Sequence, residues 1–239
     1  MTRFGSVFKL LLCGALFSPM AYGGTVTTFK TGSIVIPMDQ TYQDDGILDA
    51  YGLVYALLQE PINVHWIVDS GKSYGDADIS DLSTYLTSGV PLDAEERDFK
   101  AGPFVIDAAD ASDALVIIED WQSMGWGAEA YYTDEDESFE VSRTLFVAPS
   151  IAIYEDGKED IAWEYLNASG IPDFDGLEWD EDSAYNLSER EIEGADAKTP
   201  GDGKLFDEDD YPAYCHLNAM HWDDDTPGSI VMEIRAFAE

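Results

Sequence analysis

The stretch from Gly32 to Asp69 constrains the fold most, because it predicts a strand, a helix and a second strand in direct succession. Apolar and β-branched residues at 33–38 predict the first strand. Apolar residues recur at helical spacing over 47–58, and Glu60-Pro61 predicts the end of this helix, because proline pushes the preceding residue out of the α region. Residues 63–68 predict the second strand. Such a unit favours two parallel neighbouring strands joined by a right-handed crossover.

Further along the chain, short apolar strands again alternate with helices. Strands are predicted at 104–106 and 150–154, and a helix is predicted after each of them. This alternation predicts an α/β domain of three layers, in which a mostly parallel sheet is flanked by helices. Acidic, glycine and small polar residues dominate 173–210, and this range is predicted to form an acidic, loop-rich insertion.

Residues 24–239 are expected to form a single domain, because they are enough for one sizeable core and few for two. The chain stops at Glu239, directly after a predicted helix that carries Ile230 and Ile234 and lacks a C-cap signal. A domain truncated at its C-terminus is therefore an alternative to a natural end.

The first 23 residues predict a signal peptide. Arg3 and Lys9 provide a basic start, residues 10–20 form an apolar core, and small residues before position 24 suit cleavage after Gly23. We expect export to the periplasm or the extracellular space. Only Cys215 remains after cleavage, so no intrachain disulfide can form, which fits a bacterial exported protein.

The net charge of −37 restricts the partners that the chain can bind. Nucleic acid and anionic membranes are disfavoured, because both would repel it. One explanation is a halophilic surface whose carboxylates are screened by salt. The other is binding of Ca²⁺, which prefers carboxylate oxygens. The calcium candidates lie in two incomplete calcium-loop patterns: Asp76, Asp78, Asp81, Asp173, Asp175, Asp180 and Asp182.

Three residues are candidates for catalysis: Cys215, His216 and His65. A cysteine nucleophile needs a base, and His65 on another strand is the candidate partner. Zinc is disfavoured, because a strand over 213–222 would turn His216 and His221 to opposite faces. No cofactor site is predicted at Gly125 to Ala130, whose G-x-G-x-x-A pattern follows a helix and precedes a strand, and so predicts a helix C-cap and a turn.

Four aspartates follow predicted strand ends: Asp39, Asp69, Asp107 and Asp156. If those strands are parallel neighbours, the carboxylates converge on one rim, where they could bind a ligand or a cation or serve as acid and base. The alternative is that each aspartate caps a local helix or turn.

Several segments together carry a resemblance: Ile36 to Asp39, Ala50 to Leu58, Val64 to Trp66, Gly102 to Asp107 and Ala162 to Pro172. They resemble the N-terminal part of long exported bacterial proteins of uncharacterised function, over most of residues 32–239. The expected architecture is also similar to the glutamine-amidotransferase-like α/β fold. This second similarity is an analogy of fold and implies no activity.

The sequence favours a non-enzymatic exported surface or ligand-binding module. One alternative is a hydrolase- or amidotransferase-like enzyme or its inactive fragment, which predicts that His65, His216 or Cys215 lies near a rim carboxylate or near one another. The other alternative is a calcium-dependent interaction protein. No motif indicates a particular partner or an oligomeric state.

Overall fold

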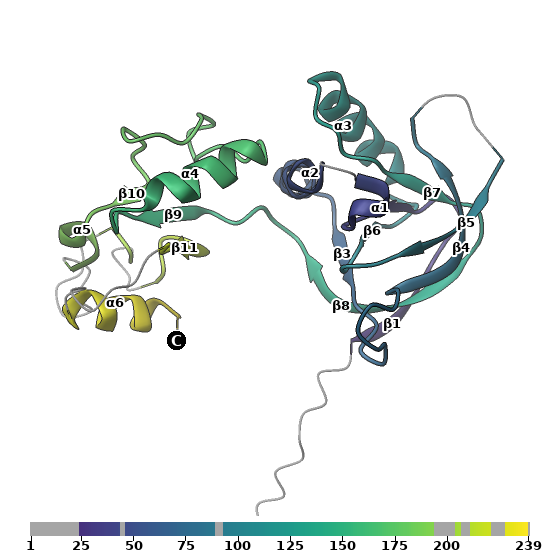
Figure 1. Ribbon diagram of the computed structural model, residues 1–239, viewed down its shortest axis with the longest axis horizontal. Helices are drawn as coiled ribbons and strands as arrows, with labels where there is room; N and C mark the ends of the chain where they lie inside the picture. Colours follow the sequence, from purple (N-terminus) through teal and green to yellow (C-terminus); the bar gives the residue numbers. More distant parts are fainter. Residues whose placement is uncertain are drawn as a thin grey trace, which may run out of the picture.

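The computed structural model describes residues 24–43, 46–88, 93–193, 204–206, 211–220 and 228–238. They form a larger lobe around an eight-stranded sheet and a smaller lobe around a three-stranded sheet (Figure 1). The segment 146–150 joins the lobes. The predicted signal peptide lies outside the described residues.

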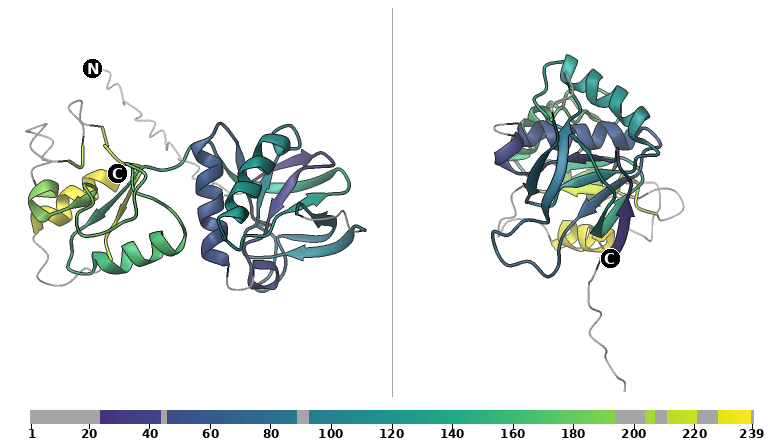
Figure 2. Two further views of the ribbon diagram at one scale, coloured as in Figure 1. Left: turned by 90° about the horizontal axis from the view of Figure 1, so that it is seen from above. Right: turned by 90° about the vertical axis from the view of Figure 1, so that its right-hand side faces the viewer.

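The larger sheet is antiparallel throughout, in the order β1-β8-β3-β6-β2-β7-β4-β5, and it curls into a half-barrel (Figures 1 and 2). Its strands are β1 (Thr25–Phe29), β2 (Ile34–Ile36), β3 (Val64–Ile67), β4 (Ile79–Leu86), β5 (Glu95–Phe99), β6 (Phe104–Ile106), β7 (Tyr131–Thr133) and β8 (Glu137–Leu145). The prediction of a mostly parallel sheet flanked by helices is therefore wrong.

The strand–helix–strand unit over Gly32 to Asp69 shows why the predicted parallel pairing does not form. Its strands β2 and β3 both form, but β6 lies between them and pairs antiparallel with each. Val105 of β6 is paired with Val35 on one side and with His65 on the other. The strands β2 and β3 run in the same direction without being neighbours, so the connecting helix crosses over one strand.

Two apolar cores fix the larger lobe. The helices α2 (Ile47–Gln59) and α3 (Ala111–Ser123) accompany one core, in which Leu53, Leu57 and Ile118 are fully buried. The short helix α1 (Gln40–Gln43) packs Tyr42 against the second core. The second core joins Phe29 of edge strand β1 to Phe99 of edge strand β5. Because residues from both edges meet in one cluster, this core lies on the inner face of the curl.

The smaller lobe contains the only strands that pair in parallel among the described residues. Its strands are β9 (Ile151–Tyr154), β10 (Asn186–Leu187) and β11 (His216–Asn218), in the order β10-β9-β11. Its helices are α4 (Glu159–Ala168), α5 (Glu189–Glu193) and α6 (Gly228–Ala238). Alternation along β9 sends Ile153 to the core of α4, and Tyr154 to the core of α5 and α6.

The predicted acidic insertion over 173–210 is more than a surface excursion. In its described part it supplies β10 and α5, and it buries Trp179, Leu187 and Ile192. These residues complete both cores of the smaller lobe. Most acidic side chains of the described part of this segment are exposed, whereas Asp173 is buried.

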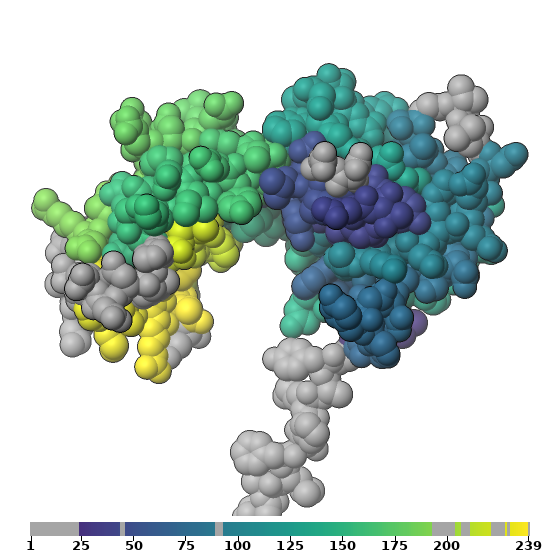
Figure 3. Space-filling model, in the orientation of Figure 1, coloured from purple at the N-terminus to yellow at the C-terminus, as the bar shows by residue number. Residues whose placement is uncertain are grey.

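The two lobes touch along a narrow contact, where the green surface of the smaller lobe meets the blue surface of α2 (Figure 3). Tyr55 of α2 packs against the α4 core, and the N–H of Ala148 donates to the carbonyl of Leu58. Within the described residues, no helix has the length and apolar character needed to cross a membrane.

Candidate binding pocket

His65, a predicted catalytic residue, lies beside a predicted rim carboxylate. Its Nε2 atom is 3.1 Å from Oδ2 of Asp107, and its Nδ1 atom is 3.0 Å from Oγ1 of Thr144 on β8. Only 12% of the imidazole side chain is exposed, against 42% of Asp107. The ring packs edge-on against Phe29. A hydroxyl, an imidazole and a carboxylate thus form one hydrogen-bonded chain across three strands.

The other two catalytic candidates lie in the smaller lobe. Cys215 is exposed, and its backbone N–H bonds to residue 150. His216 is also exposed, and its Nε2 atom is 2.8 Å from Oδ1 of Asn218. The structure does not bring either residue to His65, which belongs to the other sheet. His221 lies outside the described residues.

The expected rim of carboxylates does not form, because the preceding strands are not parallel neighbours. Asp39, Asp69 and Asp156 each accept a hydrogen bond, at 2.9, 2.8 and 2.9 Å respectively, from the backbone N–H two residues further along. They act as local caps of turns and helices, and Oδ2 of Asp39 also accepts from the N–H of Lys100 at 2.9 Å. Asp107 differs, because its carboxylate bonds to His65.

The calcium candidates are not brought together either. The buried carboxylate of Asp78 accepts from Lys72 Nζ at 2.5 Å and from the N–H of Gly102 at 2.9 Å. The buried Asp173 accepts from Ser183 Oγ at 2.7 Å and from two backbone N–H groups of its own turn. The remaining candidates are exposed: Asp76, Asp81, Asp175, Asp180 and Asp182. In the part of the chain that the structure describes, no three His, Cys, Asp or Glu residues are grouped to hold a metal ion.

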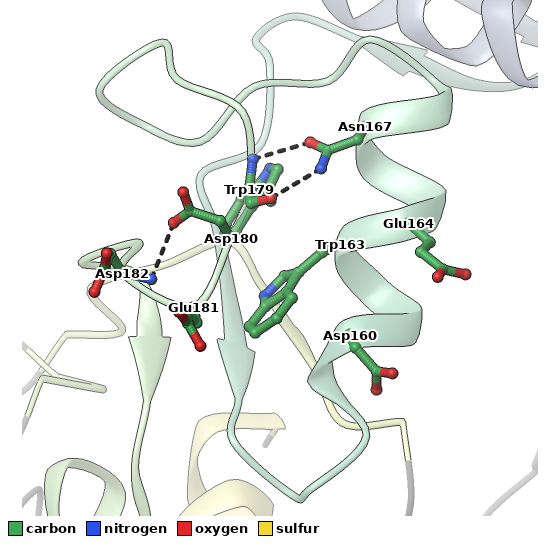
Figure 4. A pocket seen from close by; sticks show the side chains of 8 residues that line it. All are labelled: Asp160, Trp163, Glu164, Asn167, Trp179, Asp180, Glu181 and Asp182. Atoms are coloured by element: carbon green, nitrogen blue, oxygen red, sulfur yellow. Dashed lines mark hydrogen bonds between the residues drawn. The ribbon is translucent and has the colours of Figure 1, made fainter.

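A pocket of about 430 Å³ lies beside α4 in the smaller lobe (Figure 4). One face of the helix lines it with residues at positions i, i+3, i+4 and i+7, which are Asp160, Trp163, Glu164 and Asn167. The opposite face of α4 buries Ala162 and Leu166 against β9. The helix therefore presents one polar stripe to the pocket because its other stripe is held by the core.

The facing wall, residues 179–182, is tied to α4. The Nδ2 of Asn167 donates to the carbonyl of Trp179 at 2.8 Å, and its Oδ1 accepts from the N–H of Trp179 at 2.9 Å. The Trp179 ring is buried, and its Nε1 donates to the carbonyl of Ile171. The ring of Tyr185 packs edge-on against Trp179. Burial of Tyr185, and to a smaller extent its hydrogen bond to Asp175, raises the pKa of its hydroxyl. The second wall is thus fixed relative to the helix.

The indole ring of Trp163 lies between the helix and the facing loop (Figure 4). Its Nε1 donates to Oδ1 of Asn186 at 2.9 Å, and Nδ2 of Asn186 donates to the carbonyl of Asp180 at 2.7 Å. The half-buried ring is therefore held in place, with its nitrogen already satisfied, and it offers the pocket its aromatic surface.

Most of the side-chain hydrogen-bonding groups that remain open in the pocket are acceptors. Four lining carboxylates bond to no other described residue: Asp160, Glu164, Glu181 and Asp182. A fifth, Asp180, accepts one hydrogen bond from the N–H of Asp182. Each side-chain nitrogen that lines the pocket, on Trp163, Asn167 and Trp179, already donates within the protein. The pocket is therefore negative and rich in unused acceptors.

Sequence reasoning missed the α4 half of this pocket. It identified Asp180 and Asp182, but as parts of a calcium loop. The signal that could have found the pocket is the helical spacing of Asp160, Trp163, Glu164 and Asn167, an acidic and aromatic stripe on a helix that buries its other side.

Comparisons of this chain with protein-family models, with curated proteins and with solved structures found no match. The resemblance to long exported bacterial proteins stays a prediction.

Proposed function

We propose that this protein is a non-enzymatic binding module whose ligand is positively charged and occupies the pocket beside α4. The observation that carries the proposal is the fixed ring of Trp163 in a hollow lined by five carboxylates. An aromatic face attracts a cation through its quadrupole. The carboxylates add Coulomb attraction, which is stronger beside a protein wall than in bulk water.

The volume and the rigidity of the pocket support the same proposal. A hollow of about 430 Å³ falls within the usual range for small-ligand sites. Both walls are fixed before any ligand arrives, since Asn167 ties residues 179–182 to the helix. Preorganisation of this kind reduces the entropic cost of binding.

The test is calorimetric titration of the protein with hexamethylenediamine at physiological ionic strength, where the Debye length is about 8 Å. We expect saturable one-to-one binding that the double variant Glu181→Gln with Asp182→Asn weakens. Neither side chain bonds to another described residue, so this variant should keep the wild-type melting temperature.

The matched control neutralises two neighbouring carboxylates outside the pocket, Glu119→Gln with Asp120→Asn on α3. The proposal requires that this control bind the diamine as the wild type does. An equal loss in both double variants would mean general attraction to an acidic surface, and the proposal would be abandoned.

A second candidate function, acid–base catalysis, is favoured by one observation. Thr144, His65 and Asp107 form a hydrogen-bonded chain of the types used to activate a hydroxyl. The binding module remains the first candidate, because the carboxylate pocket is an open site with fixed walls, whereas the imidazole is nearly buried.

A further inference from the structure

We infer that the pocket beside α4 selects a flexible chain with two N–H-bearing cations, ammonium or guanidinium, over quaternary ammonium ions, metal ions and sugars. This inference rests on the proposed function and names its ligand class. It follows from which groups of the pocket remain unused, and from where they lie.

The unused groups favour N–H donors. The carboxylates of Asp160, Glu164, Glu181 and Asp182 accept nothing from other described residues, so each has open lone pairs. An ammonium or guanidinium group can form short, charge-assisted hydrogen bonds with them. A quaternary ammonium ion of equal charge has no N–H, so it would gain only the cation–π attraction to the ring of Trp163 and the Coulomb attraction to the carboxylates.

The unused hydrogen-bonding groups of the pocket suit a sugar poorly. A hydroxyl both donates and accepts, so a sugar needs donors from the protein as well as acceptors. The indole nitrogens of Trp163 and Trp179 already donate within the protein, and one of the two N–H groups of Asn167 Nδ2 donates to the carbonyl of Trp179. Hydroxyl oxygens brought into the pocket would face carboxylates, which accept only.

The distribution of the carboxylates favours an extended cation over a metal ion. No three of them are grouped to hold one ion. They lie in two places: Asp160 and Glu164 on the helix, with side chains that point away from the loop, and Glu181 and Asp182 on the loop, with Trp163 between the two pairs (Figure 4). A chain with a cation at each end could satisfy both walls while its methylenes lie along the indole ring.

The experiment compares hexamethylenediamine with hexamethonium, which has the same linker and the same charge but carries methyl groups in place of every N–H. We expect the diamine to bind at least about tenfold more tightly, as charge-assisted hydrogen bonds at both ends imply. Equal affinities would overturn the inference and leave the proposed function standing, whereas failure of both probes to bind would overturn the proposed function itself.

Two variants test the two walls separately. The double variant Asp160→Asn with Glu164→Gln should lower the affinity for the diamine by about tenfold. The double variant Glu181→Gln with Asp182→Asn should lower it by a similar factor. Loss in only one of them would overturn the two-wall arrangement.

A capped peptide with two lysines serves as a third probe. If the peptide binds more tightly than the diamine, the source of the cations is a protein segment, and if it binds more weakly, the source is a free polyamine. We expect no saturable binding of trehalose or of calcium ions added as calcium chloride. Binding of either one as tightly as the diamine would contradict the inference.

Discussion

Gly52 of α2 lies directly against the backbone carbonyl of Ser169, at the end of α4, and a Cβ atom at Gly52 would overlap that oxygen. The same Cβ would also come within 2.7 Å of the ring of Trp121 on α3. The contact between the lobes therefore depends on the absence of a side chain at one helical position. It also orients α4, and so the pocket, relative to the larger lobe.

The first prediction is that Gly52→Ala destabilises the protein. Glycine inside a helix normally costs stability relative to alanine, so without the clash this change would be favourable. Because a backbone carbonyl has to move, we expect a net loss of about 2 kcal/mol in the free energy of unfolding. Urea denaturation of the full chain measures it. The control is Gly228→Ala in α6, where an added Cβ meets nothing within 4 Å, and no loss is expected.

The second prediction concerns the buried ion pair between Asp78 and Lys72. The Asp78 side chain is fully buried, and it bonds to Lys72 and to the N–H groups of Asp69 and Gly102. Asp78→Asn leaves the lysine ammonium without its counter-charge, so we expect a loss of about 3 kcal/mol. Asp76→Asn is the matched control, because Asp76 is exposed and its carboxylate accepts one hydrogen bond, from the N–H of Ser73. Similar midpoints in urea for the two variants would contradict the prediction.

Much of the local structure could be predicted from the sequence, because it depends on residues that are close in the chain. The apolar spacing over 47–58 located α2, and the runs at 104–106 and 150–154 located β6 and β9. The pairing could not be predicted, because nothing local to β2 or β3 shows that β6 enters between them. The charged strand β5, whose sequence is EERDF, also gave no strand signal, since an edge strand needs little burial.

For the candidate sites too, contacts between residues close in the chain could be predicted, and contacts made by the tertiary fold could not. An aspartate whose carboxylate has a local partner, such as Asp69, follows the capping alternative that the sequence offered. The enzyme alternative placed His65, His216 or Cys215 near some rim carboxylate, but which pair would meet could not be predicted, because the contact of His65 with Asp107 depends on the antiparallel neighbours β3 and β6. The pocket joins α4 to a loop through Asn167, and only the folded chain shows that link.

The third prediction is that Glu155→Gln stabilises the protein at neutral pH. Burial, and then the like charges of Glu191 and Glu159, raise the pKa of Glu155 above its ordinary value of 4.5, and Lys204 only partly offsets them. The folded state therefore holds this proton more tightly than the unfolded state does. Stability is lost as the pH rises through 4.5 toward the raised pKa, and it is not regained above it.

Because Glu155 is exposed enough for solvent to screen these charges, the expected gain at neutral pH is about 0.5 kcal/mol. The gain should vanish below pH 4.5, where the carboxyl is protonated in both states. Melting temperatures of the wild type and the variant over a pH series measure the difference. A gain that persists in acid would show that the effect is not electrostatic.

The last prediction separates the two candidate roles of His65. If its bonds to Thr144 and Asp107 serve to hold strands together, His65→Gln should lower the free energy of unfolding by about 1–2 kcal/mol, as expected for disturbing two hydrogen bonds. The wild type should then hydrolyse p-nitrophenyl acetate no faster than His65→Gln does. This is the outcome we expect, because a binding module needs no nucleophile. Turnover by the wild type that is lost in both His65→Gln and Thr144→Val, while the folded fraction of each variant stays unchanged, would instead establish acid–base catalysis at this site.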